Sequence, residues 1–145
     1  MSEAEKSAGW IYVARSAKLS KWGGDVGVGK HVFKVGCTTE AVEPLVRAGF
    51  AGETDWKVVG KLSVEDVDEE AMLARVARKL KIIDPVLYPK LKGTPGIVKV
   101  TPASVENHLL LTLALANRDL QGVKVAPGDY GTYLIHVATG SPPPS

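Results

Sequence analysis

Short runs of β-branched and aromatic residues alternate along this chain with segments of helical apolar spacing. Two such runs, residues 10–14 and 32–35, are separated by turn-forming residues, a pattern typical of two antiparallel strands. Further strands are expected over residues 56–62, 97–100 and 130–137. Helices are expected from Thr38 or Thr39 to about Ala48, over the segment that follows residues 63–68, and from Ala103 to about Gly122. This order predicts an α+β fold, a small mixed or antiparallel sheet flanked by helices.

The segment between the first two strands, residues 18–30, is too long for a tight turn and is expected to be a mobile loop. It leads into a near match to a phosphate-binding loop, G-x-x-x-x-G-K over residues 24–30. That motif needs a serine or threonine next and a helix afterwards. Here His31 and a predicted strand follow, so nucleotide hydrolysis is not expected.

The 145 residues, 45% of them apolar, are enough for one packed domain, which is expected over residues 9–138. Residues 1–8 form a polar stretch expected to be a flexible tail, and residues 139–145 a proline-rich tail. The first residues do not resemble a signal peptide, and no apolar run approaches membrane-spanning length. The single cysteine, Cys37, excludes an internal disulfide. A soluble intracellular protein, cytoplasmic or nuclear, is therefore expected.

Charge is unevenly distributed although the net charge is only +2. Residues 53–70 carry seven acidic and two basic side chains, and residues 75–101 carry seven basic and one acidic. Acidic residues at the start of a helix and basic residues at its end favour the helix dipole, which explains much of this pattern. Lys90, Lys92 and Lys99 lie beyond that helix, and lysines in this segment could attract phosphate.

Tyr12 and Lys34 are the polar groups that the first two strands could present together. The run Lys34-Val35-Gly36-Cys37-Thr38-Thr39 follows the K-I-G-x-T-T pattern of the phage-associated branch of the GIY-YIG nuclease superfamily, and the chain resembles that superfamily from residue 9 to about residue 108. Trp10 stands where the first motif usually has glycine. The resemblance implies a GIY-YIG-like α+β domain that cleaves nucleic-acid phosphodiesters with Mg²⁺.

The resemblance also implies roles for particular residues. Tyr12 would act as the base or its relay, Lys34 and Arg47 would contact the phosphate, and Glu70 would hold the metal. Arg47 lies about one helical turn beyond the position where the family has its arginine. The family's metal-binding glutamate often has a histidine four residues later. One alignment places Glu70 at the glutamate position and Ala74 at the histidine position. Another places Leu73 and Ala77 there and lacks the carboxylate as well. Lys90 and Lys92 are expected to add phosphate contacts.

Because this constellation is incomplete, weak or absent cleavage is expected. An alternative is a catalytically inactive member, a pseudoenzyme, that binds nucleic acid or a protein partner. A third possibility is a self-assembling structural module, since the helix over residues 103–120 has more leucine than one face of a small sheet requires, which indicates a homo-oligomer. The three histidines and Cys37 show no metal-binding spacing.

Overall fold

The computed structural model describes residues 8–139, so all but one residue of each tail expected over residues 1–8 and 139–145 lie outside the described residues. Thr139, expected in the second tail, is instead the last residue of a helix. Five strands form one antiparallel sheet in the order β3-β1-β2-β5-β4. Their bounds are β1 Gly9–Arg15, β2 Val32–Thr38, β3 Lys57–Val64, β4 Lys81–Ile82 and β5 Ile97–Lys99. The expected α+β class is confirmed.

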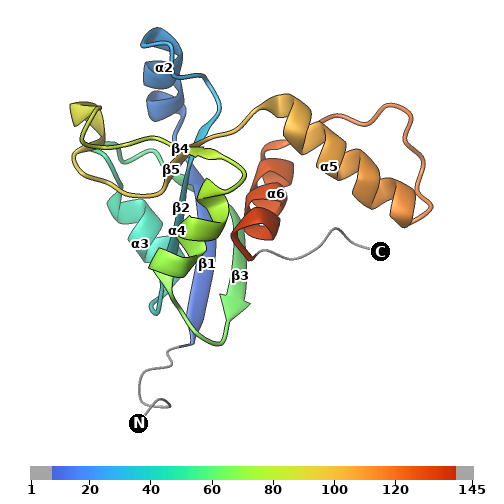
Figure 1. The fold of residues 1–145 in the computed structure, drawn as a ribbon, viewed down its shortest axis with the longest axis horizontal. Coiled ribbons are helices and arrows are strands. Elements are labelled where there is room, and N and C mark those ends of the chain that lie inside the picture. Colours follow the sequence, from blue (N-terminus) through green and yellow to red (C-terminus); the bar gives the residue numbers. More distant parts are fainter. Residues whose placement is uncertain (1–7, 140–145) are drawn as a thin grey trace.

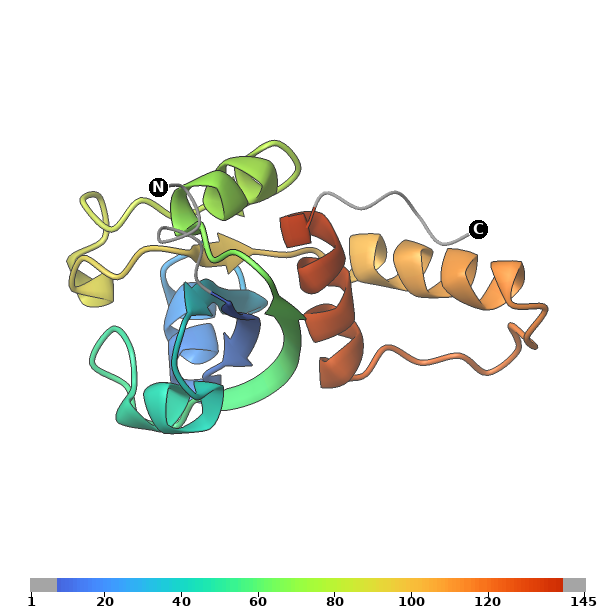
Figure 2. The ribbon, with the colours of Figure 1, turned by 90° about the horizontal axis from the view of Figure 1, so that it is seen from below.

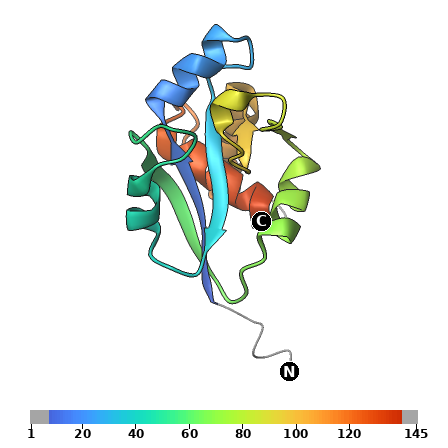
Figure 3. The same ribbon diagram turned by 90° about the vertical axis from the view of Figure 1, so that its left-hand side faces the viewer.

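Helices pack on both faces of this sheet (Figures 1 and 3). One face is covered by α2, Ala17–Asp25, by α3, Val42–Ala48, and by the short 3-10 helix η1, Pro89–Leu91. The other face is covered by α4, Glu69–Ala77, and α6, Pro127–Thr139, with the first turn of α5, Pro102–Leu115. Strand side chains alternate between these layers, so that Ile11 and Val13 belong to one core and Tyr12 and Ala14 to the other.

The helix α2 replaces the mobile loop expected over residues 18–30, and that expectation was wrong. Ser16 caps the helix by accepting a hydrogen bond from the backbone N–H of Leu19 at 3.0 Å, and Leu19 is fully buried. Two consecutive glycines, Gly23 and Gly24, disfavour a helix in isolation. Burial of Leu19 against the sheet outweighs that local preference. The glycine-rich loop is confined to residues 26–31, and β2 follows it as expected.

The last element is helix α6 and not the strand expected over residues 130–137. Pro127 stands at its first position, and the Asp129 carboxylate accepts a hydrogen bond from Ala126 N–H at 2.7 Å. Its buried residues have helical spacing: Tyr130, Gly131, Leu134, Val137 and Ala138. The β-branched and aromatic content that suggested a strand is therefore explained by packing of one helical face. Strand β4, which was not expected, forms the sheet edge instead.

The remaining helices fall near their expected positions. Helix α3 begins at Val42 after Ala41, which makes no side-chain cap, and not at Thr38 or Thr39 as expected. Pro44 therefore lies in its first turn, where proline is tolerated, and Gly49 ends it. Helix α4 begins after the cap Asp68 and buries Met72 and Val76. Helix α5 begins at Pro102, after the cap Thr101 and next to its expected start, but ends at Leu115, earlier than the expected Gly122.

Among the described residues, no helix is both long and apolar enough to cross a membrane.

Candidate functional site

Tyr12 and Lys34 lie on neighbouring antiparallel strands with their side chains on the same face, as expected. Tyr12 is paired with Gly36, and Lys34 is paired with Ala14, two positions along the same ladder. Residues two apart on a strand share a face, so the tyrosine and the lysine are diagonal neighbours. This part of the prediction is confirmed.

Both side chains are buried, however, with Tyr12 only 2% and Lys34 only 4% exposed. The Tyr12 ring stacks on Phe50, with ring centroids 6.1 Å apart, and belongs to the core beneath α3. Burial, followed by the charges of Glu69 and Cys37, raises the pKa of the Tyr12 hydroxyl above its usual value. A tyrosine with a raised pKa stays protonated at neutral pH and is therefore a poor base. The resemblance implies a tyrosine that reaches the phosphate, and the burial of Tyr12 does not support that role.

The Lys34 amine is committed to a structural contact. Its Nζ donates a hydrogen bond to the Pro95 carbonyl oxygen at 2.7 Å and lies 5.4 Å from the centroid of the Phe50 ring. Burial lowers the pKa of Lys34, and the nearby Glu69 opposes that shift. The amine therefore ties β2 to the loop before β5.

Arg47 does not join this pair. It lies in the last turn of α3 and is exposed. Its charge helps to lower the pKa of Glu43, one turn earlier, after the larger effect of the Lys61 hydrogen bond, whereas the groups that shift Tyr12 and Lys34 do not include it. Arg47, one helical turn beyond the position of the family's arginine, therefore lies at the surface.

Glu70 is exposed on α4, and within residues 8–139 its side chain makes no hydrogen bond or ion pair. The preceding residue, Glu69, is half-buried, and its Oε2 accepts a hydrogen bond from the Cys37 backbone N–H at 3.2 Å. The charge of Glu69 acts on Tyr12, Lys34 and Cys37. Sequence spacing favoured Glu70, whereas the geometry brings Glu69 to β2 at Cys37, because one residue turns a helix by about 100°.

The sheet lies between helix α4, which carries the expected metal ligand Glu70, and the expected base Tyr12. Met72 and Val76 of α4 pack in the core on the face opposite to Tyr12. Figure 3 shows α4 and α3 on either side of β2. In the described part of the chain no group of three or more histidine, cysteine or acidic side chains could hold a metal ion.

The two further lysines expected to bind phosphate lie in or beside η1. Lys90 Nζ is 2.5 Å from Glu53 Oε2, and that ion pair is partly shielded from solvent. Lys92 is exposed, and its aliphatic chain lies against Gly52. Both therefore pack near the turn after α3, and only Lys92 keeps its charge unpaired among the described residues.

Cys37 is half-buried, and burial together with Glu69 raises the pKa of its thiol to about 11. It remains a thiol at neutral pH and lacks the character of a nucleophile.

A contact that sequence reasoning missed joins His108 on α5 to His136 on α6, whose ring centroids lie 4.8 Å apart. It could not be predicted because the two histidines are far apart along the chain and because a strand was expected over residues 130–137.

Comparisons with protein-family models, curated proteins and solved structures find no match to this chain.

Proposed function

We propose that this protein is a non-catalytic module that self-associates through helix α5. The observation that carries the proposal is the exposure of this helix. All but one of its 14 residues lie outside the buried core, the exception being Val105. Helices that are apolar on all sides are ordinarily covered.

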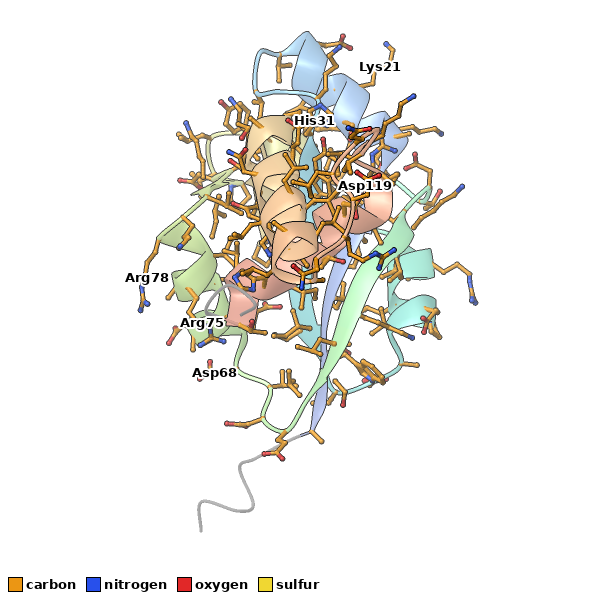
Figure 4. All side chains as sticks on the ribbon, turned by 90° about the vertical axis from the view of Figure 1, so that its right-hand side faces the viewer. Lys21, His31, Asp68, Arg75, Arg78 and Asp119 are labelled. Atoms are coloured by element: carbon orange, nitrogen blue, oxygen red, sulfur yellow. The ribbon has the colours of Figure 1, made fainter. Side chains whose placement is uncertain are left out.

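Leucines that are exposed to solvent or partly buried occupy α5 from its middle to its end. Leu111 is 44% and Leu115 46% exposed, and Leu109, Leu110 and Leu113 are half-buried. Figure 2 shows α5 extending away from the sheet, in contact with the body of the protein near its beginning. In Figure 4 it crosses the front of the molecule, with Asp119 in the loop that follows. Covering these leucines would stabilise an assembly by the hydrophobic effect.

Charge favours a second copy of the chain as the partner. No acidic residue, lysine or arginine lies between Glu106 and Arg118. Glu106 is exposed near the start of α5, and Arg118 is exposed just past its end, held there by a 2.8 Å hydrogen bond from its N–H to the Leu113 carbonyl. In an antiparallel pair of α5 helices centred near Thr112, Glu106 of each copy lies level with the partner's Arg118. The interface is then self-complementary, as two-fold symmetry requires.

Charge reversal tests this arrangement. Glu106→Arg or Arg118→Glu alone places like charges together twice in each dimer and should weaken dimerisation roughly fivefold or more. The double variant reverses both charges and should restore the dimer. A double variant as weak as the singles would reject the antiparallel arrangement. A wild-type protein that stays monomeric at high concentration would reject self-association.

Nuclease activity is the second candidate, and the placement of Tyr12 and Lys34 on one face of the paired strands β1 and β2 favours it. We expect weak or absent cleavage of DNA or RNA with Mg²⁺ or Mn²⁺, because a missing electrostatic contact costs roughly a hundredfold or more in rate. The test is a time course of wild type beside Tyr12→Phe, Glu69→Ala and Glu70→Ala. Rapid metal-dependent cleavage that is lost in Tyr12→Phe and in either glutamate variant would establish an enzyme and contradict the non-catalytic part of the proposal.

A further inference from the structure

Two histidines distant in the sequence meet where α5 packs on α6. The rings of His108 and His136 have centroids 4.8 Å apart and are tilted by 48°. Tyr133, one turn from His136 on α6, presents its ring to His108 at 5.5 Å in an edge arrangement. Both imidazoles are half-buried. The two imidazole rings therefore form a direct contact between α5 and α6.

The Nε2 atom of His108 is buried and has no hydrogen-bond partner within the described part of the chain. Leaving a buried polar atom unpaired is costly, so such an atom in a folded protein calls for an explanation. An imidazole nitrogen binds a metal ion through its lone pair, so a buried ring nitrogen without a hydrogen-bond partner is available as a ligand.

The separation of the rings fits two imidazoles on one ion. Metal–nitrogen distances of about 2.0–2.1 Å and a roughly tetrahedral angle place the two ring centroids roughly 5 Å apart. Imidazole suits borderline transition metals, with Cu²⁺ and Zn²⁺ among the most strongly bound. We propose that His108 and His136 form a site for a divalent transition metal, Zn²⁺ or Cu²⁺, that links α5 to α6.

The site uses two protein ligands, since no third histidine, cysteine or acidic side chain of residues 8–139 joins them. Water would complete the coordination, so the affinity should be moderate and the ion exchangeable. Binding to the folded chain should raise the melting temperature by roughly 5–10 °C when free metal exceeds its dissociation constant about a hundredfold. The proposal does not depend on self-association, because both ligands belong to one chain.

The experiment is calorimetric titration of tag-free, metal-stripped protein with Zn²⁺, beside His108→Gln, His136→Gln and His31→Gln. His31 is a matched control, because its ring also contacts a tyrosine, Tyr130, at a centroid distance of 5.5 Å but contacts no other histidine among the described residues. We expect one ion per chain, binding weakened at least tenfold by either of the first two substitutions, and no change with the third. Absence of saturable binding, or equal weakening in all three variants, would overturn the proposal.

A second measurement decides the matter if a variant fails to fold. Wild-type protein with one equivalent of Cu²⁺ should give an electron paramagnetic resonance spectrum with hyperfine coupling to two imidazole nitrogens. A spectrum with hyperfine coupling to only one imidazole nitrogen, or the spectrum of aqueous Cu²⁺, would contradict the proposed site. Circular dichroism of each variant identifies the cases in which this second measurement is needed.

Discussion

The hydroxyl oxygen of Tyr12 lies against the α-carbon of Gly36, where an added β-carbon would fall 2.5 Å from it. The two residues face each other across the β1–β2 ladder. Gly36 therefore gives the Tyr12 ring its place over the sheet, and the glycine that suggested a nuclease motif has a packing role.

Replacing Gly36 with alanine should destabilise the protein by about 1–3 kcal/mol, because the ring must move within a packed core. Urea unfolding measures the change. The control is Gly128→Ala in the first turn of α6, where an added β-carbon meets no atom within 4 Å and should leave stability unchanged or slightly raised. Equal effects of the two substitutions would contradict this account of Gly36.

Acid should destabilise the fold through His31 and His108. Burial lowers the pKa of both imidazoles below the ordinary value of 6.5, with Arg15 and Lys30 adding to the shift of His31 and His136 to that of His108. The unfolded chain therefore takes up protons first as the pH falls. The contribution to stability is complete above pH 6.5 and declines below it.

The measurement is the free energy of unfolding between about pH 8 and pH 5.5, in the presence of a chelator so that no metal contributes. His31→Gln and His108→Gln should each flatten the decline. A wild-type free energy that stays constant or rises on acidification over this range would refute the expected direction.

Nucleic acid, if bound, should be held weakly and in a salt-dependent way at the edge of the sheet. Lys81 and Lys99 are direct cross-strand partners and line a cavity of about 180 Å³ with Tyr88 and Asp84. Neither lysine forms an ion pair among the described residues. Two lysines side by side repel each other, and a phosphate group would relieve that repulsion.

Lys81→Ala and Lys99→Ala should each reduce the slope of log affinity against log salt by about 1. Lys61→Ala is the control, because Lys61 is already paired with Glu43 at 2.6 Å. Fluorescence anisotropy over a range of salt concentrations gives the slopes. Affinity that is independent of salt would indicate a ligand of different chemistry.

Local pattern was sufficient to place Tyr12 and Lys34 on paired strands, because side-chain alternation and the intervening turn residues are both local signals. It could not predict their burial. That depends on Phe50, the Pro95 carbonyl and helix α3, which reach the pair only in the folded chain.

The choice between Glu69 and Glu70 shows a second limit. Either residue satisfies the composition of a helix start, and the position of the Asp68 cap decides which carboxylate reaches Cys37. The contact between His108 and His136 was equally inaccessible, since it exists only because residues 127–139 form a helix whose glycine, Gly131, lets its backbone approach β3 at Gly60.

Sedimentation velocity over a range of concentrations tests the central claim, self-association through α5, most directly. Wild type should form dimers, and Leu111→Glu should be monomeric, because it places a charge in the apolar interface. Leu62→Glu is the matched control, since Leu62 on β3 is 40% exposed against 44% for Leu111 and lies off α5. The account predicts that Leu62→Glu dimerises like wild type. Dimerisation unaffected by Leu111→Glu, or a monomeric wild type, would contradict it.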